Sequence, residues 1–254
     1  MALIEALIFD VDGTLAETEE LHRLAFNASF AAAGLTWVWD RARYGQLLEV
    51  TGGKERMKHF VAQYGGAPAL DGAQIAALHA DKTARYTAMV EAGELRLRPG
   101  IERLLAEAKA AGLKLAIATT TSRANVDALL LATLGTQPFD VIAAGDEVAA
   151  KKPAPDVYRL AVDGLGVSAA ACIAFEDTAN GLRSAVGAGV ACLMTVSAFG
   201  GNGPFPGALA VVDHLGDSGN AASVMAGPPL AGQVVDIAAL EALLAVPKPA
   251  PAPP

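Results

Sequence analysis

Two aspartates, Asp10 and Asp12, directly follow the apolar run Ala6–Phe9. Side chains two residues apart on a strand share one face, so both carboxylates can point the same way. Gly13 then permits a sharp turn, and open α/β sheets bind ligands at the carboxyl ends of their strands. One carboxylate could attack a phosphorus atom while its neighbour moves a proton, and both could help to hold magnesium. Taken alone, the segment is also consistent with a simple Asp-Gly turn.

Hydroxyl side chains gather where a second strand-like segment ends, from Thr119 through Thr120 and Thr121 to Ser122. A helix is predicted to begin immediately afterwards. Hydroxyls and free backbone amides at a helix N-terminus suit the oxygens of a phosphate. Capping of the helix by Ser122 would explain the same residues without any ligand.

A lysine pair and an acidic pair complete the set of candidate chemical groups. Lys151 and Lys152 precede two prolines in a loop that leads into a helix, and a lysine held there could pair with a phosphate and a carboxylate. Loop lysines are more commonly solvated. Glu176 and Asp177 end another apolar run, where a bound cation would relieve their repulsion. The alternative is that Asp177 caps the next helix while Glu176 is solvated.

The elements that must position these groups alternate along most of the chain. Helical patterns lie between apolar runs: one from Pro99 to Gly112, one over 125–134, and one from Pro155 to Gly164. Runs that are apolar on both faces suit a parallel sheet covered by helices, so we expect an α/β fold with a doubly wound parallel sheet. The predicted strands are Leu7–Phe9, Leu113–Ala118, Val141–Ala144, Cys172–Phe175, Cys192–Val196 and Leu209–Val212.

Residues 17–94 break this alternation, because helical patterns there follow one another without a convincing strand. We therefore expect an inserted α-helical cap domain at 17–94, between the two parts of the core domain at 1–16 and 95–246. Two short connections would let the cap hinge over the sheet edge. The Pro/Ala-rich tail 247–254 is expected to be disordered. The predicted cap helices are Leu21–Ala33, Arg41–Leu48, Lys54–Tyr64 and Gln74–Val90.

Composition narrows the class of partner. The 254 residues are 53% hydrophobic with a net charge of -8, and without a basic stripe we expect no nucleic-acid partner. Without a run of 18 apolar residues we expect no membrane partner. Cys172 and Cys192 lie in apolar runs and are expected to be buried free thiols. We expect a cytoplasmic protein, monomeric, with a small-molecule substrate.

In their order and spacing, the four chemical segments resemble the haloacid-dehalogenase-like (HAD) phosphotransfer superfamily, over roughly residues 4–197. The resemblance implies a Rossmann-like core and a phosphoryl transfer in which Asp10 becomes an aspartyl phosphate. It implies that Asp12 is the general acid and base, and that Lys152 steadies the nucleophile and the phosphate. Thr119 and the backbone amide of Thr120 would hold the phosphoryl group.

The same resemblance implies a Mg²⁺ cofactor, whose charge would offset that of the transferring group. Its ligands would be Asp10, the backbone carbonyl of Asp12, and Asp177. Glu176 would bind it directly or through water. The intact motif residues argue against a non-catalytic binding protein that has merely kept the fold.

The helical insert resembles that of the β-phosphoglucomutase-like branch, and finer features resemble the CbbY-type sugar-bisphosphate phosphatases. These features include the segment 12–22, Trp37 to Asp40, and Thr51 to Arg56. The resemblance implies hydrolysis of xylulose-1,5-bisphosphate, an inhibitor of Rubisco in the Calvin cycle, to xylulose 5-phosphate. A sugar phosphomutase of the β-phosphoglucomutase type is the alternative.

A bisphosphate needs a cation for its distal phosphate, and Lys54, on the Gly-Gly turn into a helix, is the best candidate; it could equally be a solvated lysine. Arg85 and Arg56 are weaker candidates. Glu17, His22 and Tyr44 are further candidates for contacts with the sugar or a phosphate. Trp37 and Trp39 are expected to belong to the core of the cap.

Overall fold

The computed structural model describes residues 4–63, 70–200 and 203–246. Its seven-stranded sheet has the order β3-β2-β1-β4-β5-β6-β7, with β1 to β6 parallel and β7 antiparallel to β6. This confirms the predicted α/β fold and its six strands. The strands are β1 (Ala6–Phe9), β2 (Lys114–Ala118), β3 (Val141–Ala143), β4 (Cys172–Glu176), β5 (Ala191–Thr195), β6 (Val211–Val212) and β7 (Val224–Ala226).

The edge strand β7 was not expected from the sequence. It is three residues long, and Met225 at its centre is 56% exposed, so it lacks the apolar run that marks a buried strand. Strand β7 is held at the edge of the sheet by its antiparallel pairing with β6.

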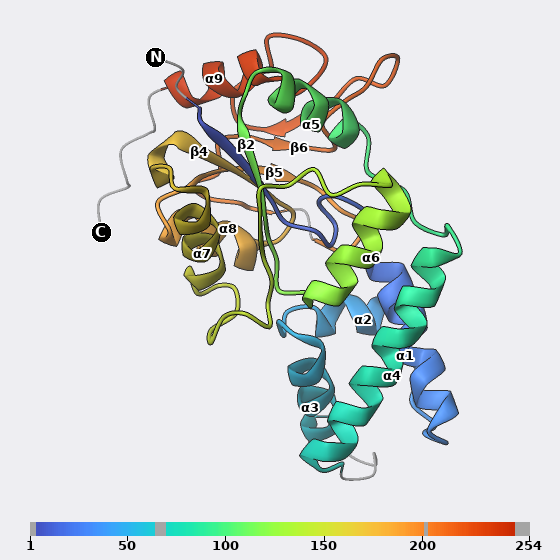
Figure 1. The fold of residues 1–254 in the computed structure, drawn as a ribbon. Coiled ribbons are helices and arrows are strands. Elements are labelled where there is room, and N and C mark those ends of the chain that lie inside the picture. Colours follow the sequence, from blue (N-terminus) through green and yellow to red (C-terminus); the bar gives the residue numbers. More distant parts are fainter. Residues whose placement is uncertain (1–3, 64–69, 201–202, 247–254) are drawn as a thin grey trace.

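Helices cover both faces of the sheet (Figure 1). Leu7 and Phe9 of β1 pack on one side with α5 (Ile101–Ala110), α6 (Arg123–Leu134) and α9 (Ile237–Ala245). Ala6 and Ile8 pack on the other side with α7 (Asp156–Leu165) and α8 (Ala179–Gly187). This is the period of two that a strand buried on both faces requires. The predicted end of α7 at Gly164 is too early, because the left-handed residue that ends it is Gly166.

Four helices lie between β1 and α5, below the sheet in Figure 1: α1 (Glu19–Ala32), α2 (Arg41–Leu47), α3 (Gly53–Gln63) and α4 (Gly72–Glu91). They surround an aromatic core of their own, which contains Trp37 and Trp39 as predicted. Near its end, α4 also contributes Tyr86 and Val90 to the core beneath the sheet. We propose that residues 17–94 form the cap domain. Residues 64 and 247–254, which the sequence assigned to a helix end and a disordered tail, lie outside the described residues.

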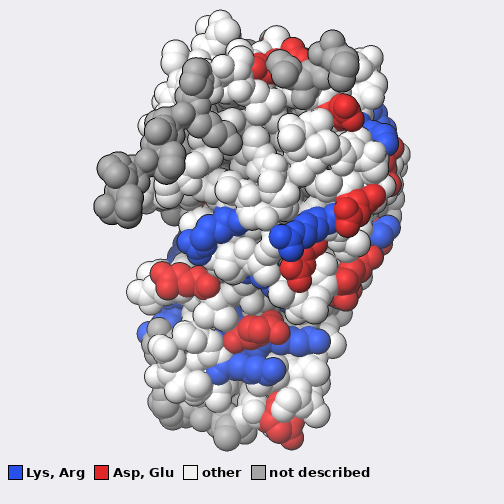
Figure 2. Space-filling model, turned by 90° about the vertical axis from the view of Figure 1, so that its left-hand side faces the viewer, with Lys and Arg blue, Asp and Glu red and all other residues white. Residues whose placement is uncertain are grey.

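Cys172 and Cys192 are buried free thiols, as predicted. None of the helices in the described part of the chain is long and apolar enough to cross a membrane. On the face shown in Figure 2, acidic and basic side chains are interspersed instead of forming a patch of one sign.

Arg98 ties the connection from the cap to three loops at the carboxyl edge of the sheet. Its buried guanidinium donates to the carbonyls of Gly13, Val196 and Asp213, the last two at 2.5 and 2.6 Å. It also contacts the Thr195 hydroxyl at 3.1 Å. One side chain therefore satisfies several backbone acceptors that would otherwise be buried without partners.

Replacing Arg98 by methionine should lower the free energy of unfolding by about 3 kcal/mol, because buried carbonyls then lose their donors. Urea denaturation measures this. The matched control is Arg96→Met, which removes an exposed arginine from the same connection and should change stability by less than about 0.5 kcal/mol. Equal effects of the two substitutions would contradict the bracing role of Arg98.

Candidate active site

The predicted motif residues converge at the carboxyl edge of the sheet. Strand β1 lies between β2 and β4, so Asp10, Thr119 and Asp177 follow neighbouring strand ends. Lys152 reaches the same place from the loop between β3 and α7. Residues from distant parts of the sequence are thus brought together by strand order, as expected for an open α/β sheet.

Lys152 is the centre of the charge arrangement. Its Nζ donates to Asp10 Oδ1 at 2.7 Å, to Glu176 Oε1 at 2.5 Å and to the Ala118 carbonyl at 2.8 Å. Burial opposes the charge on Lys152, but the two carboxylates outweigh burial and raise its pKa above the usual range. Tyr158, which the sequence analysis did not single out, donates to Glu176 Oε1 at 2.7 Å.

Three buried carboxylates could hold a cation. Oxygen atoms of Asp10, Glu176 and Asp177 lie within 4.8 Å of one another. Glu176 Oε2 and Asp177 Oδ1 are buried without a hydrogen-bond partner among the described residues. Burial, reinforced by neighbouring acids, raises the pKa of Asp10 to about 7 and the pKa of Asp177 well above its usual range. Oxygen ligands that need a positive charge fit a hard divalent cation.

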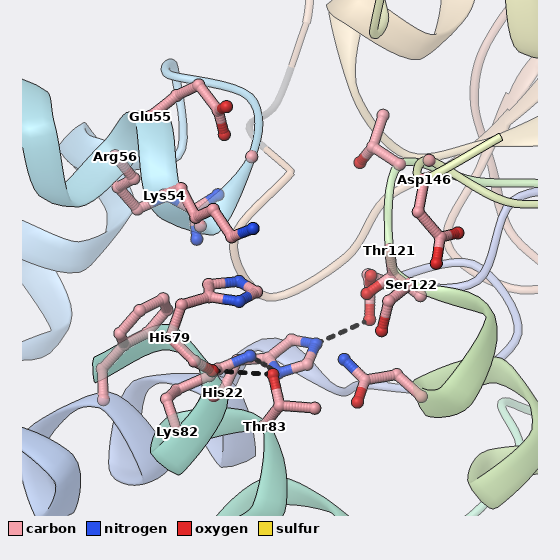
Figure 3. Close-up of a pocket in the computed structure, with 18 of the residues that line it drawn as sticks. His22, Lys54, Glu55, Arg56, His79, Lys82, Thr83, Thr121, Ser122 and Asp146 are labelled. Atoms are coloured by element: carbon pink, nitrogen blue, oxygen red, sulfur yellow. Dashed lines mark hydrogen bonds and ion pairs between the residues drawn. The ribbon is translucent and has the colours of Figure 1, made fainter. Parts of the chain in front are cut away.

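The Asp12 side chain lines both cavities, and its hydrogen bonds go to residues at the start of α1. Its Oδ1 accepts a hydrogen bond from Thr18 at 2.5 Å. It accepts another from His22 Nε2 at 3.1 Å, drawn as the dashed line from His22 in Figure 3. Lys82 Nζ lies 2.7 Å from His22 Nδ1. A lysine ammonium can only donate, so Nδ1 accepts and the ring proton is on Nε2, directed at Asp12. Burial alone would raise the pKa of Asp12, but His22, Thr18 and Lys82 lower it below its usual range.

Lys82 was missed by the sequence analysis, although a signal was present. It occupies a buried position of α4 in helical spacing with Ile75, Leu78 and Tyr86. A lysine on an apolar helix face needs a partner. Burial lowers the pKa of Lys82 to about 8, although Asp12 and Glu19 oppose this change.

A cavity of about 700 Å³ extends from Asp12 between the cap and the core. Lys54 and His79 reach into it from the cap, and Thr121 and Ser122 form part of the opposite wall (Figure 3). A smaller cavity at the reacting end is lined by core residues that include Asp10, Lys152 and Asp177. The cap residues Glu19 and Arg56 line both cavities.

The remaining predicted contacts are placed differently. Thr120 lines both cavities, whereas Thr119 is buried and its hydroxyl accepts from the Thr121 amide at 3.2 Å. Tyr44 is fully buried, and its hydroxyl contacts two residues that do line the cavities: Glu19, which the sequence analysis missed, at 2.6 Å, and Arg56 at 3.2 Å. His22 and Lys54 do line the large cavity.

Glu17 and Arg85 lie outside the linings of both cavities. Glu17 pairs with Arg98 at 3.3 Å instead of facing the cavities. Arg85 forms an ion pair with Asp81 one turn away on α4, at 2.7 Å. The structure therefore does not bring these two side chains to the site.

Comparisons with known proteins agree with this fold and site. The family model for haloacid dehalogenase-like hydrolases matches residues 4–189. Protein CbbY of Cereibacter sphaeroides is 50% identical over 232 residues, which cover 90% of this chain and 100% of that protein. A crystal structure of CbbY from Rhodobacter sphaeroides in complex with xylulose-1,5-bisphosphate is 52% identical, with a TM-score of 0.80, over 83% of this chain and 94% of that chain.

A β-phosphoglucomutase structure from Clostridium difficile has a TM-score of 0.69 over 83% of this chain and 91% of that chain. At 23% identity it shows a shared fold. The chain belongs to the haloacid dehalogenase-like hydrolase family. Within that family it is a phosphatase, and it is similar to the CbbY proteins over most of its length.

Magnesium should raise the melting temperature more at about pH 8 than at about pH 5. The raised pKa values of Asp10 and Asp177 mean that the folded, metal-free protein binds more protons than the unfolded chain above about pH 4. Its stability therefore falls as pH rises through about 7, and a cation that binds the ionised carboxylates offsets that loss.

Scanning fluorimetry with and without Mg²⁺ measures the difference. Asp177→Asn should abolish most of the shift, while Asp163→Asn, which changes an exposed acid on α7, should leave it intact. A shift that is independent of pH would argue against a cation at the buried carboxylates.

Proposed function

We propose that this phosphatase is magnesium-dependent and hydrolyses a small sugar bisphosphate, xylulose-1,5-bisphosphate, to xylulose 5-phosphate and phosphate. The observation that carries the proposal is a buried nucleophile in one cavity and a lysine in an adjoining cavity, with Glu19, Arg56 and Thr120 lining both. Asp10 is held by Lys152 beside the acidic cluster in the smaller cavity, and Lys54 reaches into the larger cavity from the cap. The sugar bisphosphate in the crystal structure of the 52% identical relative supports this choice of substrate.

The chemistry follows from the positions of the two aspartates. A carboxylate oxygen of Asp10 attacks phosphorus, and Asp12, which must be protonated when the substrate is bound, gives that proton to the departing sugar oxygen and becomes the carboxylate that His22 stabilises. Water then attacks the aspartyl phosphate and gives its proton to Asp12, which restores the starting state. The Nε2–H of His22 holds the Asp12 carboxylate in place for both proton transfers.

Charge on the transferring group is offset from two sides. Lys152 supplies one positive charge through its contact with Asp10. Mg²⁺, bound by Asp10, Asp177, the Asp12 carbonyl and Glu176 directly or through water, would neutralise the phosphoryl oxygens. Thr120 lines both cavities, where its backbone amide can donate to the same oxygens.

The distal phosphate would lie at the far end of the large cavity. There Lys54 faces a wall that includes Ser122 and Asn125, in the first turn of α6. Ser122 Oγ and Asn125 Oδ1 are buried without a partner in the described part of the chain, so Ser122 takes the N-cap position without making the capping bond. Polar groups at a helix N-terminus, opposite a lysine, suit a phosphate group whose neighbouring sugar hydroxyls can pair with them.

The mutase alternative is not favoured. The β-phosphoglucomutase neighbour shares 23% identity, which shows a common fold, whereas the CbbY relatives share about half of their residues with this chain.

We also propose that the enzyme is a cytoplasmic monomer acting on an inhibitor of Rubisco in the Calvin cycle. The CbbY resemblance supports the metabolic role, and two buried free thiols suit a reducing compartment.

The purified enzyme should release inorganic phosphate from xylulose-1,5-bisphosphate in the presence of Mg²⁺ and should yield xylulose 5-phosphate. Asp10→Asn should abolish this release while keeping the fold, because the near-isosteric amide cannot attack phosphorus. Phosphate release and product identity are measured over a panel of phosphosugars that includes β-glucose 1-phosphate. Isomerisation without phosphate release would overturn the phosphatase assignment in favour of a mutase. Wild-type rates in Asp10→Asn would overturn the mechanism.

Lys54→Ala should weaken transition-state binding of the bisphosphate by about 2–4 kcal/mol in kcat/KM, because the distal phosphate loses its cation. Hydrolysis of a small aryl phosphate, which has no distal phosphate, should change little. The matched control is Lys58→Ala, which removes an exposed lysine one turn further along α3, outside the cavity lining. An equal loss on both substrates would place Lys54 in the chemistry or the fold, and no loss on either would make it a solvated surface residue.

A further inference from the structure

A side chain of the core, Phe199, packs against the cap and also lines the smaller cavity that contains Asp10 and Asp177. It lies on the loop that follows β5 and packs against the aromatic core of the cap. Its ring meets the ring of Tyr44 edge to face, with centroids 5.7 Å apart and planes at 89°. The guanidinium of Arg41 lies 5.4 Å from the centre of the same ring. Contacts of this kind depend on orientation and so specify a relative position.

The loop that carries Phe199 is fixed to the reacting end of the site. Ser197 Oγ donates to Asp177 Oδ2 at 2.6 Å and accepts from the Gly200 amide at 2.7 Å. A Cβ atom on Gly200 would lie 2.5 Å from the Asp177 carbonyl oxygen, so the loop packs directly on this proposed metal ligand. The position of the Phe199 ring is therefore set relative to Asp177.

On its other side, Tyr44 holds the two charged cap residues that line both cavities. Its hydroxyl donates to Glu19 Oε2 at 2.6 Å and accepts from Arg56 Nη1 at 3.2 Å. The Arg56 guanidinium also lies 5.3 Å from the centre of the Tyr44 ring. Arg56 is further held by the Leu47 carbonyl, at 3.1 Å. Any displacement of the Tyr44 ring would move both charges with respect to the reacting phosphate.

We propose that Phe199 is a positioning residue for phosphosugar hydrolysis, acting through Tyr44 to hold Glu19 and Arg56 against the sugar. The proposal rests on the proposed function, because it needs a substrate that fills the space between cap and core. Phe199 connects the part of the core that holds Asp177 to the part of the cap that faces the substrate. Small errors in such a placement are costly, because the reacting groups must be held within fractions of an ångström.

The experiment compares kcat/KM for xylulose-1,5-bisphosphate and for a small aryl phosphate in four proteins. These are the wild type, Phe199→Ala, Tyr44→Phe and the double variant. Phe199→Ala should lower kcat/KM for the bisphosphate by about 10- to 100-fold, with a raised KM. The decrease in kcat/KM for the aryl phosphate should be several times smaller. Phe199→Tyr, which keeps an aromatic ring, should restore most of the loss.

The double variant tests the route of action. Tyr44→Phe keeps the ring but removes the hydroxyl that holds Glu19 and Arg56, so adding Phe199→Ala should cost much less than it costs alone. The matched control is Phe205→Ala, which truncates a half-buried phenylalanine that packs on the core and not on the cap. Phe205→Ala should change the ratio of kcat/KM for the bisphosphate to kcat/KM for the aryl phosphate by less than about twofold.

Several results would overturn the inference while leaving the function intact. They are an equal loss by Phe199→Ala on both substrates, additive losses in the double variant, or no loss at all. Failure of the wild type to hydrolyse xylulose-1,5-bisphosphate would instead contradict the proposed function. The same four proteins would then be compared on the phosphosugar that the wild type hydrolyses fastest, so that the two failures remain distinct.

Discussion

The contact of Lys152 with Asp10 and Glu176 is the interaction on which the rest of the site depends. Three carboxylates meet at the end of buried strands, and burial raises the pKa of two of them, Asp10 and Asp177. The lysine offsets part of that charge, and its ammonium also binds the backbone at the end of β2. Negative charge remains in excess, because Glu176 Oε2 and Asp177 Oδ1 have no hydrogen-bond partner among the described residues. This excess supports the proposed cation at the site.

The aspartates of one motif are placed in opposite electrostatic surroundings. Burial raises the pKa of Asp10 to about 7 although Lys152 opposes this change, whereas His22, Thr18 and Lys82 outweigh burial and lower the pKa of Asp12. Two residues apart on the chain, the two carboxylates therefore have different partners, Lys152 for Asp10 and Thr18 with His22 for Asp12. The partners of Asp10 come from the core, and those of Asp12, Thr18 and His22, come from the start of α1 in the cap, where Lys82 of α4 contacts His22. The difference is therefore made by the insertion of the cap next to the first motif.

The cap and the core also divide the work of recognition. The core holds the reacting groups on rigid strand ends, while the cap contributes Lys54, Arg56 and Glu19 to the walls of the cavity. Contacts between the core and the cap fix the position of one relative to the other. Phe199 packs on Tyr44, and Asn180 Nδ2 donates to the Thr51 hydroxyl at 3.2 Å. A phosphatase built this way can vary its substrate through the cap without altering its phosphoryl chemistry.

The sequence by itself determined the elements and the motif residues. Apolar runs with a polar end, such as Ala6–Phe9 before Asp10, carry both the strand and its reactive group, so local pattern is enough to find them. The pattern also located the helical insert and its aromatic core.

Only the tertiary structure decided which side chains of the insert face the cavity. Tyr44 and Glu17 were plausible contacts by residue type, yet one is buried behind Glu19 and the other pairs with Arg98. Lys82 contacts His22, 60 positions away, and Arg98 contacts Gly13, 85 positions away. Phe199 contacts Tyr44, more than 100 positions away. Contacts at such distances along the chain are set by packing between elements, which no local pattern encodes.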